Sequence, residues 1–411
     1  MRQATGLVYR VSIPRYLLGR SLGPVWPWLL YGPLSSIALQ RRPLPQPPEG
    51  DWLELRTRLC GICGSDVALM RGKSSPSLSP FHSFPAVLGH EVLADVAGPD
   101  GDALAGRRVV VDPVISCQMR GVEPCPACAA GQSQQCRRRG ERDGLGPGTL
   151  VGYHSRLPGG FGDRLFAHRS QLYAVPDHVP DERAVLSEPY AIALHAVLRS
   201  LPPVGAKVLV LGGGTIGLLT VAALARHTQA ETHLVARHPH QRRLGLELGA
   251  QRAYGAPGAT VAVQAAVEAQ LLRPLMGPPV FSDGFDCVYD CIGSEESLRD
   301  SLRVTRHGGK LVLLGTAGPV QVDWSFVWAN ELDLIGCFGY GRESDGRHTF
   351  AWALDDFAAA DGTVLERLIT DRYRLEDYRQ AIRRQLVAGP NRPLKAVFDF
   401  RTGARGGVAR P

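Results

Sequence analysis

The feature that most constrains the fold of this chain is a glycine-rich segment between a buried strand and a helix. The apolar run 208–211 leads into the sequence GGGTIG at 212–217, and residues 218–226 have a helical pattern. Such a segment needs one glycine for a tight turn, one for close approach of a pyrophosphate and one for helix packing. A glycine turn without a ligand is the weaker alternative. We therefore expect a helix N-terminus that binds a dinucleotide at Gly212, Gly214, Thr215, Ile216 and Gly217.

Strand and helix patterns alternate beyond residue 205. Apolar runs that read as strands occur at 207–211, 232–236, 286–290, 310–314 and 333–337. Helical patterns lie between them, which predicts a parallel, doubly wound sheet of the α/β class. Region 49–180 has short β-like runs separated by Gly and Pro, which predicts an irregular β-rich domain. Helical stretches at 349–359 and 375–386 and a strand at 394–400 are assigned back to this first domain.

The residue after the second expected strand indicates which nicotinamide cofactor binds. A carboxylate normally contacts the adenosine ribose there, roughly twenty residues past the glycine motif, but this chain has Arg237. A guanidinium binds a 2′-phosphate through a forked geometry, whereas a carboxylate repels it. We therefore expect NADP(H) rather than NAD(H), bound by Arg237, His238 and Arg242, with Arg243 as a further candidate. A solvated loop arginine with loose cofactor preference is the alternative.

Three short motifs supply a thiolate, an imidazole and a carboxylate. Cys63 lies in CGICGSD, His90 in GHE and Glu188 in SEP. Three protein ligands with a fourth position open to water or substrate are typical of catalytic zinc. Glu91 is a further candidate ligand, or a residue behind the metal. One thiolate and one carboxylate balance the zinc charge, which leaves a Lewis acid able to lower the pKa of an alcohol before hydride transfer to a nicotinamide.

Two side chains of the CGICGSD motif have candidate roles around that metal. Ser65 follows Cys63 by two residues and is a candidate to take the alcohol proton. Asp66 is a candidate to hold the non-ligating nitrogen of His90, which fixes the histidine tautomer. Each has an ordinary alternative, namely a loop hydroxyl for Ser65 and a turn-forming side chain for Asp66. Cys60 is interpreted as a buried thiol.

A second cysteine cluster contains Cys117, Cys125, Cys128 and Cys136, separated by seven, two and seven residues. Four thiolates close a tetrahedral zinc site and leave no position for substrate, so this site is predicted to be structural. Unrelated free thiols and disulfides of a secreted chain are the alternatives. The tight spacing, and the lack of a signal-peptide pattern at the start of the sequence, favour metal binding in a reducing cytoplasm.

Together these motifs resemble the zinc-containing branch of the medium-chain dehydrogenase/reductase family, in particular its polyol, threonine and glucose dehydrogenases. The resemblance runs from about residue 52 to 400 and rests on CGICGSD, GHE, GGF at 159–161, EP at 188–189, the glycine fingerprint and GGK at 308–310. It implies a GroES-like catalytic domain at 1–189 and 340–411, interrupted by a Rossmann domain at 190–339, with the active site between them. It also implies a homodimer or homotetramer.

The resemblance assigns the catalytic zinc to Cys63, His90 and Glu188, with Glu91 as the alternate carboxylate, and a structural zinc to the four clustered cysteines. Three features depart from the family pattern. Seven residues rather than the usual two separate the first two clustered cysteines, which demands a longer loop. Ala68 stands where alcohol dehydrogenases have the histidine that ends the proton relay. Residues 1–42 exceed the core fold and are expected to cover the active-site mouth or to form an oligomer contact.

The resemblance also places the substrate beside Tyr153 and His154. Polar groups there, with a glutamate on the metal, favour a polyol, a sugar-like compound or an amino alcohol, although His154 has an ordinary loop role as its alternative. The leading hypothesis is a zinc-dependent oxidoreductase that moves hydride between NADP(H) and a secondary alcohol or carbonyl. An NADPH-dependent reductase of an imine or activated double bond is the second hypothesis. A non-enzymatic nucleotide-binding protein is the third.

Charge and hydropathy exclude other partners. The net charge is +7, but basic residues do not alternate with aromatic ones in blocks, so nucleic acid is not an expected partner. The apolar stretch 16–39 is interrupted by Arg20, Pro24, Pro27 and Pro33, so it is not expected to span a membrane. We expect a cytoplasmic enzyme with a small-molecule substrate and no membrane partner.

Overall fold

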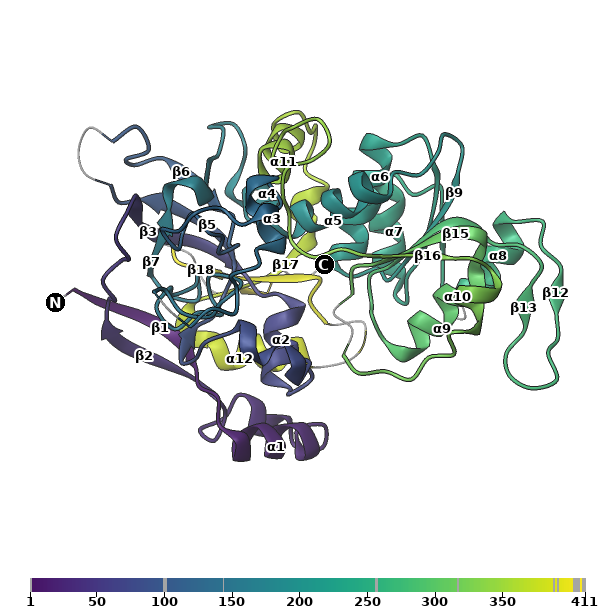
Figure 1. The fold of residues 1–411 in the computed structure, drawn as a ribbon. Coiled ribbons are helices and arrows are strands. Elements are labelled where there is room, and N and C mark those ends of the chain that lie inside the picture. Colours follow the sequence, from purple (N-terminus) through teal and green to yellow (C-terminus); the bar gives the residue numbers. More distant parts are fainter. Residues whose placement is uncertain are drawn as a thin grey trace. The chain divides into compact units, whose positions relative to one another are not determined.

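The computed structural model describes residues 2–98, 102–142, 144–255, 258–315, 318–386, 389, 392–401 and the backbone of 407–408 (Figure 1). The chain divides into two compact units. One unit comprises Met1–Glu188 and Tyr340–Pro411, and the other comprises Pro189–Gly339. The chain therefore leaves the first unit after Glu188 and re-enters it at Tyr340, so both of these residues belong to the unit that carries the cysteine motifs.

The unit Pro189–Gly339 is built on a six-stranded parallel sheet. Its strands are β9 (Lys207–Leu211), β10 (Glu231–Val235), β11 (Arg252–Tyr254), β14 (Phe285–Asp290), β15 (Thr305–Leu313) and β16 (Asp333–Gly336). They lie in the order β11-β10-β9-β14-β15-β16, and every neighbouring pair is parallel. This order, with β9 at the point where the winding reverses, confirms the predicted doubly wound fold.

The helices and the hairpin of this unit complete the alternation that the sequence predicts. They are α5 (Ser187–Ser200), which begins in the first unit, α6 (Thr215–His227), α7 (Pro239–Glu247), α8 (Gly258–Ala266), α9 (Glu295–Val304), α10 (Ser325–Ala329), β12 (Leu271–Leu272) and β13 (Val280–Phe281). Strand β9 forms because its aliphatic run is buried on both faces of the sheet, where Val208, Leu209 and Val210 have no exposed surface. Strand β15 begins at Thr305, five residues before the expected start at Lys310, because Thr305 already pairs with Phe285 and a register shift absorbs the glycines between.

The first unit is built on an eight-stranded, mostly antiparallel sheet. Its strands are β3 (Trp52–Gly61), β5 (Glu91–Val96), β6 (Arg108–Val111), β7 (Arg164–His168), β8 (Leu172–Ala174), β17 (Ile369–Tyr373), β18 (Lys395–Asp399) and β19 (Gly407–Val408). The order is β19-β17-β18-β3-β5-β6-β8, and β7 also pairs with β3. The chain after Tyr340 thus inserts β18 beside β3, which brings the C-terminal region against the CGICGSD motif.

Short helices connect these strands. They are α2 (Gly64–Met70), α3 (Pro126–Ala129), α4 (Asp181–Ala184), α11 (Thr349–Ala358) and α12 (Tyr378–Leu386), with 3-10 turns η2 (Pro76–Phe81), η3 (Ser133–Gln135), η4 (Arg169–Gln171), η5 (Leu365–Leu368) and η6 (Leu375–Asp377). Among the residues that the structure describes, no helix combines the length and the apolar character needed to cross a bilayer. In place of the single helix expected at 375–386, the structure has the 3-10 turn η6 followed by α12.

Residues 1–42 begin with a strand that is integral to the first unit. Strand β1 (Gln3–Tyr9) pairs with β2 (Ile37–Pro43) along its whole length and with β4 (Ala86–Val87) on its other edge. Its residues Leu7, Val8 and Tyr9 are almost fully buried. Between β1 and β2 the chain forms α1 (Ile13–Leu22) and η1 (Pro27–Leu30). The extension is therefore a folded hairpin with a helical insertion.

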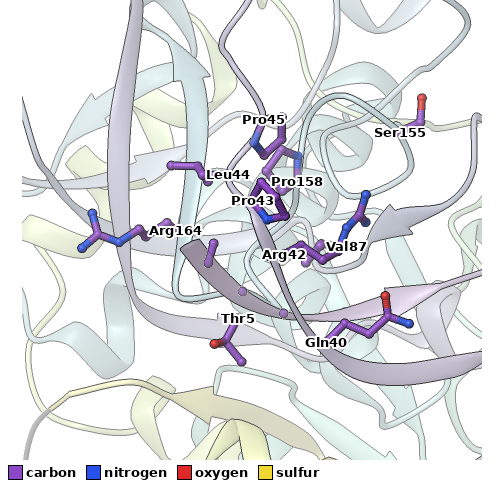
Figure 2. Close-up of a pocket in the computed structure, with 13 residues that line it drawn as sticks. Thr5, Gln40, Arg42, Pro43, Leu44, Pro45, Val87, Ser155, Pro158 and Arg164 are labelled. Carbon is purple, nitrogen blue, oxygen red and sulfur yellow. The ribbon is translucent and has the colours of Figure 1, made fainter. Parts of the chain in front are cut away.

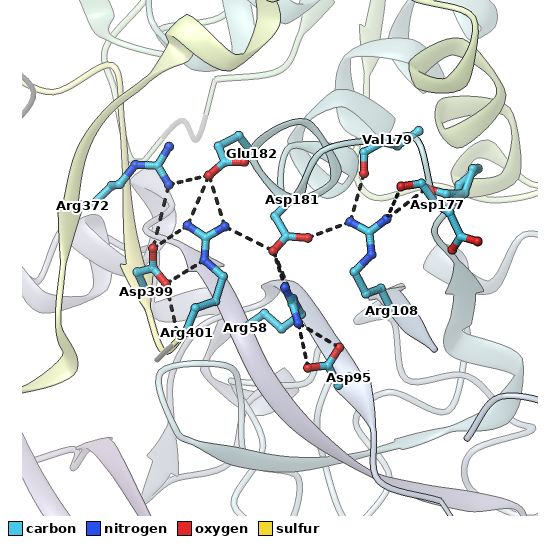
Figure 3. Close-up of polar contacts among 11 residues, drawn as sticks. Arg58, Asp95, Arg108, Asp177, Val179, Asp181, Glu182, Arg372, Asp399 and Arg401 are labelled. Atoms are coloured by element: carbon cyan, nitrogen blue, oxygen red, sulfur yellow. Dashed lines mark hydrogen bonds and ion pairs between the residues drawn. The ribbon is translucent and has the colours of Figure 1, made fainter. Parts of the chain in front are cut away.

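A network of ion pairs fixes the segment that leads to Glu188 (Figure 3). Asp181, the first residue of α4, accepts hydrogen bonds from Arg58 of β3, Arg108 of β6 and Arg401, at 2.8, 2.7 and 3.2 Å. Burial opposes ionisation of Asp181, but these guanidinium groups keep its pKa below the ordinary value. The network ties α4, which directly precedes α5 and Glu188, to several strands of the sheet at once.

Candidate metal and nucleotide sites

The motifs that contain Cys63 and His90 meet because their strands are antiparallel neighbours. Gly61 at the end of β3 lies opposite Glu91 at the start of β5. A Cβ atom at position 61 would lie 1.9 Å from a carboxylate oxygen of Glu91, so this glycine leaves the space that the carboxylate occupies. Cys63 then caps the N-terminus of α2, and Asp66 Oδ2 accepts a hydrogen bond from the Cys63 backbone N–H at 3.0 Å.

Cys63, His90 and Glu91 form a compact cluster of metal-binding side chains, in which the ligand atoms all lie within 4.8 Å of one another. Burial opposes protonation of His90, but Asp66, the Cys63 sulfur and Glu188 raise its pKa well above the ordinary value. The cluster therefore concentrates negative potential in a buried place, which is the environment that a divalent cation stabilises. A thiolate, an imidazole and a carboxylate are also the donor types that zinc prefers. The residues present thus fit a zinc ion.

The two candidate carboxylate ligands have different partners. Glu91 forms an ion pair with Lys395, whose Nζ donates to both carboxylate oxygens at 2.7 and 2.6 Å. Both side chains are almost fully buried. Glu188 lies outside the 4.8 Å cluster, and its Oε1 accepts a hydrogen bond from Tyr340 at 2.8 Å. Burial raises the pKa of Glu188 to about 7. Glu91 is thus already neutralised by a cation, whereas Glu188 is paired with a neutral hydroxyl.

Ser65, Asp66 and Tyr153 form a hydrogen-bonded group next to this cluster. The Tyr153 hydroxyl donates to Asp66 Oδ1 at 2.9 Å and lies 3.2 Å from Ser65 Oγ. Asp66 Oδ1 is 3.7 Å from His90 Nδ1, a distance too long for a hydrogen bond. That nitrogen is among the buried polar atoms without a hydrogen-bond partner in the described residues. The structure therefore brings Asp66 near His90 without a hydrogen bond between them, and the same Asp66 oxygen accepts the hydroxyl of Tyr153, so the expected role of Asp66 stays a prediction.

His154 follows Tyr153 but is directed elsewhere. Its side chain is fully buried, its Nδ1 accepts a hydrogen bond from the Arg156 backbone N–H, and a Cβ atom on Gly148 would lie 2.3 Å from its ring. Burial lowers the pKa of His154 to about 4. These contacts of His154 are thus with neighbouring loop residues on either side of it, and its expected role at the substrate stays a prediction.

The four clustered cysteines gather on the loop around α3 and η3. Their sulfur atoms all lie within 4.8 Å of one another. Two sulfur atoms each about 2.3 Å from a tetrahedral zinc ion are about 3.8 Å apart, and the sulfur atoms of Cys117 and Cys136 are 3.7 Å apart. Backbone N–H groups of Cys125 and Arg137 donate to the sulfur atoms of Cys117 and Cys125. The long loop after Cys117 therefore still returns its sulfur to the cluster, and the geometry fits zinc.

The glycine motif forms the turn between β9 and α6. Gly212 has a φ of +111°, a conformation that L side chains rarely adopt. A Cβ atom at Gly217 would lie 1.8 Å from the Gly212 carbonyl oxygen, so this position tolerates no side chain. Gly214 caps α6, and a Cβ atom there would meet nothing within 4 Å. Thr215 and Ile216 follow it as the first residues of α6, so the helix N-terminus is open to an anion.

The three basic residues expected at the adenosine ribose differ in their surroundings. Arg237 lies two residues beyond the end of β10 and is exposed. Arg242 in α7 uses Nη1 to donate to the carbonyl oxygens of Ala236 and Arg237, both at 3.0 Å. His238 caps α7, and its ring stacks on His240. Arg242 therefore braces the loop that carries Arg237, which makes Arg237 the exposed guanidinium of the group.

A pocket beneath the N-terminal hairpin does not coincide with either cluster (Figure 2). It encloses about 40 Å³ and is lined by β1, β2 and the 155–164 region, including Thr5, Arg42, Val87, Ser155 and Arg164. A volume of this size holds only a few water molecules. The pocket contains none of the expected metal or nucleotide residues, so we do not assign the substrate to it.

Two residues of the cluster region were missed by sequence reasoning, namely Lys395 and Tyr340. Both come from the chain segment after residue 339, more than 150 residues beyond the motifs that they contact. Lys395 had one available signal, since it is one of only four lysines in a chain with 46 basic residues and it opens an apolar strand. Tyr340 had none.

Comparisons with known proteins agree with this architecture. A model of the alcohol dehydrogenase GroES-like domain matches residues 49–177, and a model of the zinc-binding dehydrogenase domain matches residues 215–359. L-threonine 3-dehydrogenase of Anaeromyxobacter sp. strain K is 32% identical over 346 residues, covering 82% of this chain and 88% of that protein. L-threonine 3-dehydrogenase of Aeromonas hydrophila is 29% identical over 345 residues, covering 82% and 89%.

Solved structures show the same fold. The NADP-bound structure of a protein from Sinorhizobium meliloti 1021 described as a zinc-binding dehydrogenase has a TM-score of 0.70 and 25% identity, covering 97% of this chain and 100% of that one. L-idonate 5-dehydrogenase of Escherichia coli K-12 has a TM-score of 0.72 and 21% identity, covering 97% and 99%. Fold, motifs and relatives together define a zinc-dependent, nicotinamide-linked oxidoreductase of the alcohol dehydrogenase type that acts on small molecules.

More specifically, the chain belongs to the zinc-dependent medium-chain dehydrogenase/reductase family, among its alcohol and threonine dehydrogenase-like members.

Proposed function

We propose that this enzyme interconverts a secondary alcohol and its carbonyl with NADP(H), on a small polyol or amino alcohol. The observation that carries the proposal is the cluster of Cys63 with the buried His90 and Glu91, next to the hydrogen-bonded group that contains the Ser65 hydroxyl. The similarity to proteins named L-threonine 3-dehydrogenase supports an amino alcohol in particular, because threonine carries a secondary alcohol.

In this proposal the catalytic zinc is held by Cys63, His90 and a carboxylate, either Glu188 or Glu91. When bound, zinc supplies a Lewis acid that polarises the substrate oxygen, and NADP⁺ supplies the hydride acceptor. The second zinc is held by the four clustered cysteines and has a structural role. The ion pair with Lys395 favours Glu188 as the third ligand, because Glu91 would have to give up a buried counter-ion in order to bind the metal.

The hydroxyl of Ser65 is proposed to relay the proton that the alcohol loses, with Oγ accepting that proton while the serine's own proton passes on to water. Tyr153 lies 3.2 Å from Ser65 Oγ and donates to Asp66, so it fixes the direction in which the serine hydroxyl can turn. Asp66 in turn is anchored by the Cys63 backbone N–H. The three residues orient one proton-accepting oxygen beside the metal ligands, as general base catalysis requires. Tyr153 therefore has a positioning role in this proposal.

The NADP(H) preference rests on Arg237. The charge, exposure and position of Arg237 after β10 suit a 2′-phosphate, and the NADP-bound structure from Sinorhizobium meliloti supports this choice. The Arg237→Asp variant is expected to weaken NADPH binding by about a hundredfold while NADH binding changes little. Arg273→Asp in the β12–β13 hairpin is the matched control for the change in net charge. Equal effects of the two variants would overturn the cofactor assignment.

The reaction class is tested by following nicotinamide absorbance with NADP⁺ and NAD⁺ in parallel. The panel contains L-threonine, other amino alcohols, polyols, sugars and apolar secondary alcohols. Turnover with NADP⁺ and one of the polar classes is the expected result. Absence of alcohol oxidation together with NADPH-dependent reduction of imines or activated double bonds would replace this proposal with a reductase function.

We further propose that two copies associate through the edge of the parallel sheet. Strand β16 is an outer strand, and Leu334 within it and Phe338 just after it are exposed. An unpaired edge strand with apolar side chains is a surface that a second copy can extend. Light scattering of the purified protein is expected to give the mass of a dimer or tetramer, and a Leu334→Lys variant is expected to shift it towards the monomer.

A further inference from the structure

The helical insertion in the N-terminal hairpin exposes an unusual amount of apolar surface. Nine of the 25 large apolar side chains that are exposed in the described residues belong to residues 11–34. They are Val11, Ile13, Leu17, Leu18, Leu22, Val25, Trp26, Trp28 and Leu34. Exposed apolar residues scattered singly need no explanation, but such a concentration marks an interaction surface. We call residues 11–34 the apolar insertion.

The apolar insertion is folded against the first unit. The hydroxyl of Tyr16 donates to the Gly72 carbonyl oxygen at 3.0 Å, just beyond α2. Leu30 is buried and packs against Gly19 and Gly23. Figure 1 shows α1 at the margin of this unit, past α2 and α12. The insertion is therefore attached to the first unit, and the nine exposed apolar side chains named above face solvent.

The charge of this region is of one sign. Residues 1–48 contain six arginines and no Asp, Glu or Lys, so they contribute +6 to a net charge of +7. Arg10, Arg15 and Arg20 are exposed, and their hydrogen bonds go to the neutral acceptors Gln40, the Ser35 carbonyl and Tyr16. Three guanidinium groups thus border the apolar side chains without a carboxylate partner in the described residues.

We propose that the apolar insertion binds the surface of an anionic lipid membrane, which replaces the expectation from the sequence that the chain has no membrane partner. Exposed tryptophan and leucine beside arginine is the combination that places a segment at the boundary between headgroups and acyl chains. Helix α1 has ten residues, which is about 15 Å and half the thickness of a hydrocarbon core, so it lies in the surface instead of crossing the membrane. The proline and arginine interruptions that exclude a spanning helix are compatible with this arrangement.

Charge complementarity distinguishes lipid from a second copy of the chain. A two-fold contact would place the same patch against itself, and this patch has three exposed arginines and no carboxylate. Each basic residue near an anionic leaflet contributes attraction, whereas across a symmetric contact the same residues repel. The proposal does not depend on the substrate or the cofactor of the enzyme.

The test is co-sedimentation of the full-length, zinc-replete protein with vesicles of phosphatidylcholine alone or with about one-third phosphatidylserine. Binding is expected only to the anionic vesicles and is expected to weaken as salt is added. The proposal would be overturned if the protein sedimented with neither kind of vesicle, or if it sedimented equally with both.

Two variants locate the surface. Arg10, Arg15 and Arg20 changed together to Gln are expected to weaken vesicle binding by on the order of a hundredfold, at about fivefold for each charge. Ile13→Ser, Leu17→Ser and Trp26→Ser together are expected to weaken it at least about tenfold. The matched control is Val204→Ser, Leu275→Ser and Met276→Ser, three exposed apolar side chains of the other unit.

The control is expected to bind as the unchanged protein does, and unchanged turnover and thermal midpoint report that each variant is folded. If the arginine and apolar variants of the insertion bound vesicles as the unchanged protein does, the membrane-binding surface would lie outside the apolar insertion. Variants that lower the oligomeric mass, in a protein that vesicles do not sediment, would identify the apolar insertion as a contact between copies. Either result contradicts the proposal.

Discussion

The two clusters of metal-binding side chains in the first unit are built in opposite ways. The four cysteines come from one segment of twenty residues and share one chemistry, and backbone N–H groups donate to two of their sulfur atoms. Cys63 follows β3, whereas His90 and Glu91 stand at the start of β5, and residues around them balance charge or fix hydrogen bonds. The first cluster is determined by local chain geometry, whereas the second depends on the whole sheet. This difference is the expected one between a closed site and a site that must admit substrate.

The largest expected effect separates the two clusters by function. Cys63→Ala is expected to lower turnover by more than about a thousandfold, because it removes a ligand of the ion that polarises the substrate. Zinc analysis is expected to fall from about two ions per chain to about one, with little change in the thermal midpoint. Cys291→Ala, a thiol outside both clusters, is the control. A Cys63→Ala protein that retains both ions and its activity would refute the assignment.

The reciprocal change is expected to affect stability. Cys128→Ser removes one ligand of the closed cluster, and the midpoint of thermal unfolding is expected to fall on the order of 10 °C, because metal binding there contributes to folding. Turnover of the protein that remains folded is expected to change much less than in Cys63→Ala. The comparison would fail if Cys128→Ser abolished turnover at temperatures where circular dichroism still reports a folded protein.

The ion pair between Glu91 and Lys395 sharpens the comparison, because it is a buried, directly hydrogen-bonded pair of charged side chains beside the open cluster. Lys395→Met leaves a buried carboxylate unpaired, which is expected to cost about 3–5 kcal/mol of stability in denaturant unfolding. Arg299→Met removes a partner of the exposed ion pair with Glu295 and is expected to cost under about 1 kcal/mol. Equal losses in the two variants would show that burial does not govern the Glu91 pair.

The double variant Glu91→Gln/Lys395→Met identifies the third ligand. Removing both charges together is expected to restore most of the stability, since no unpaired charge is left. If Glu188 is the ligand, the double variant keeps about two zinc ions per chain. If Glu91 is the ligand, one ion is lost, and the ion pair seen with Lys395 is then broken when the metal binds.

The features of this molecule that its sequence predicts are the local ones, such as the closed cluster, and not those that depend on distant parts of the chain, such as the open cluster. The glycine motif and the alternating strands predict the parallel sheet because their signals are local, and β9 lies where expected. The four cysteines are recognisable from spacing alone, although the seven-residue gap obscures how Cys117 returns to its partners. Elements next to glycines are harder, as the early start of β15 shows, because a register shift leaves no mark in composition.

The open cluster is only half predictable. Its ligand candidates stand in recognisable motifs, but Lys395 reaches Glu91 only because β18 pairs with β3, a contact between residues more than 300 apart. No periodicity in a single sequence reports such a pairing. The choice between Glu91 and Glu188 cannot be made from the motifs for the same reason, since the partner of each carboxylate comes from the far end of the chain.

The smallest expected effect concerns an atom that does not touch the metal ligands directly. Tyr153→Phe removes the hydroxyl that lies between Ser65 and Asp66 and keeps the ring packed against His90. The loss of one hydrogen bond to a buried carboxylate and one to the serine is expected to lower kcat about tenfold. Zinc content and the KM for NADP⁺ are expected to stay unchanged, because neither ligand set includes Tyr153.

Tyr16→Phe is the matched control, since it removes another tyrosine hydroxyl bonded near the opposite end of α2. If both variants lower kcat equally, Tyr153 acts by holding α2 in place and its contact with Ser65 has no separate role. If only Tyr153→Phe does so, the orientation of the Ser65 hydroxyl limits proton removal. In that case the open cluster depends on groups beyond its metal ligands, which the closed cluster of four cysteines does not require.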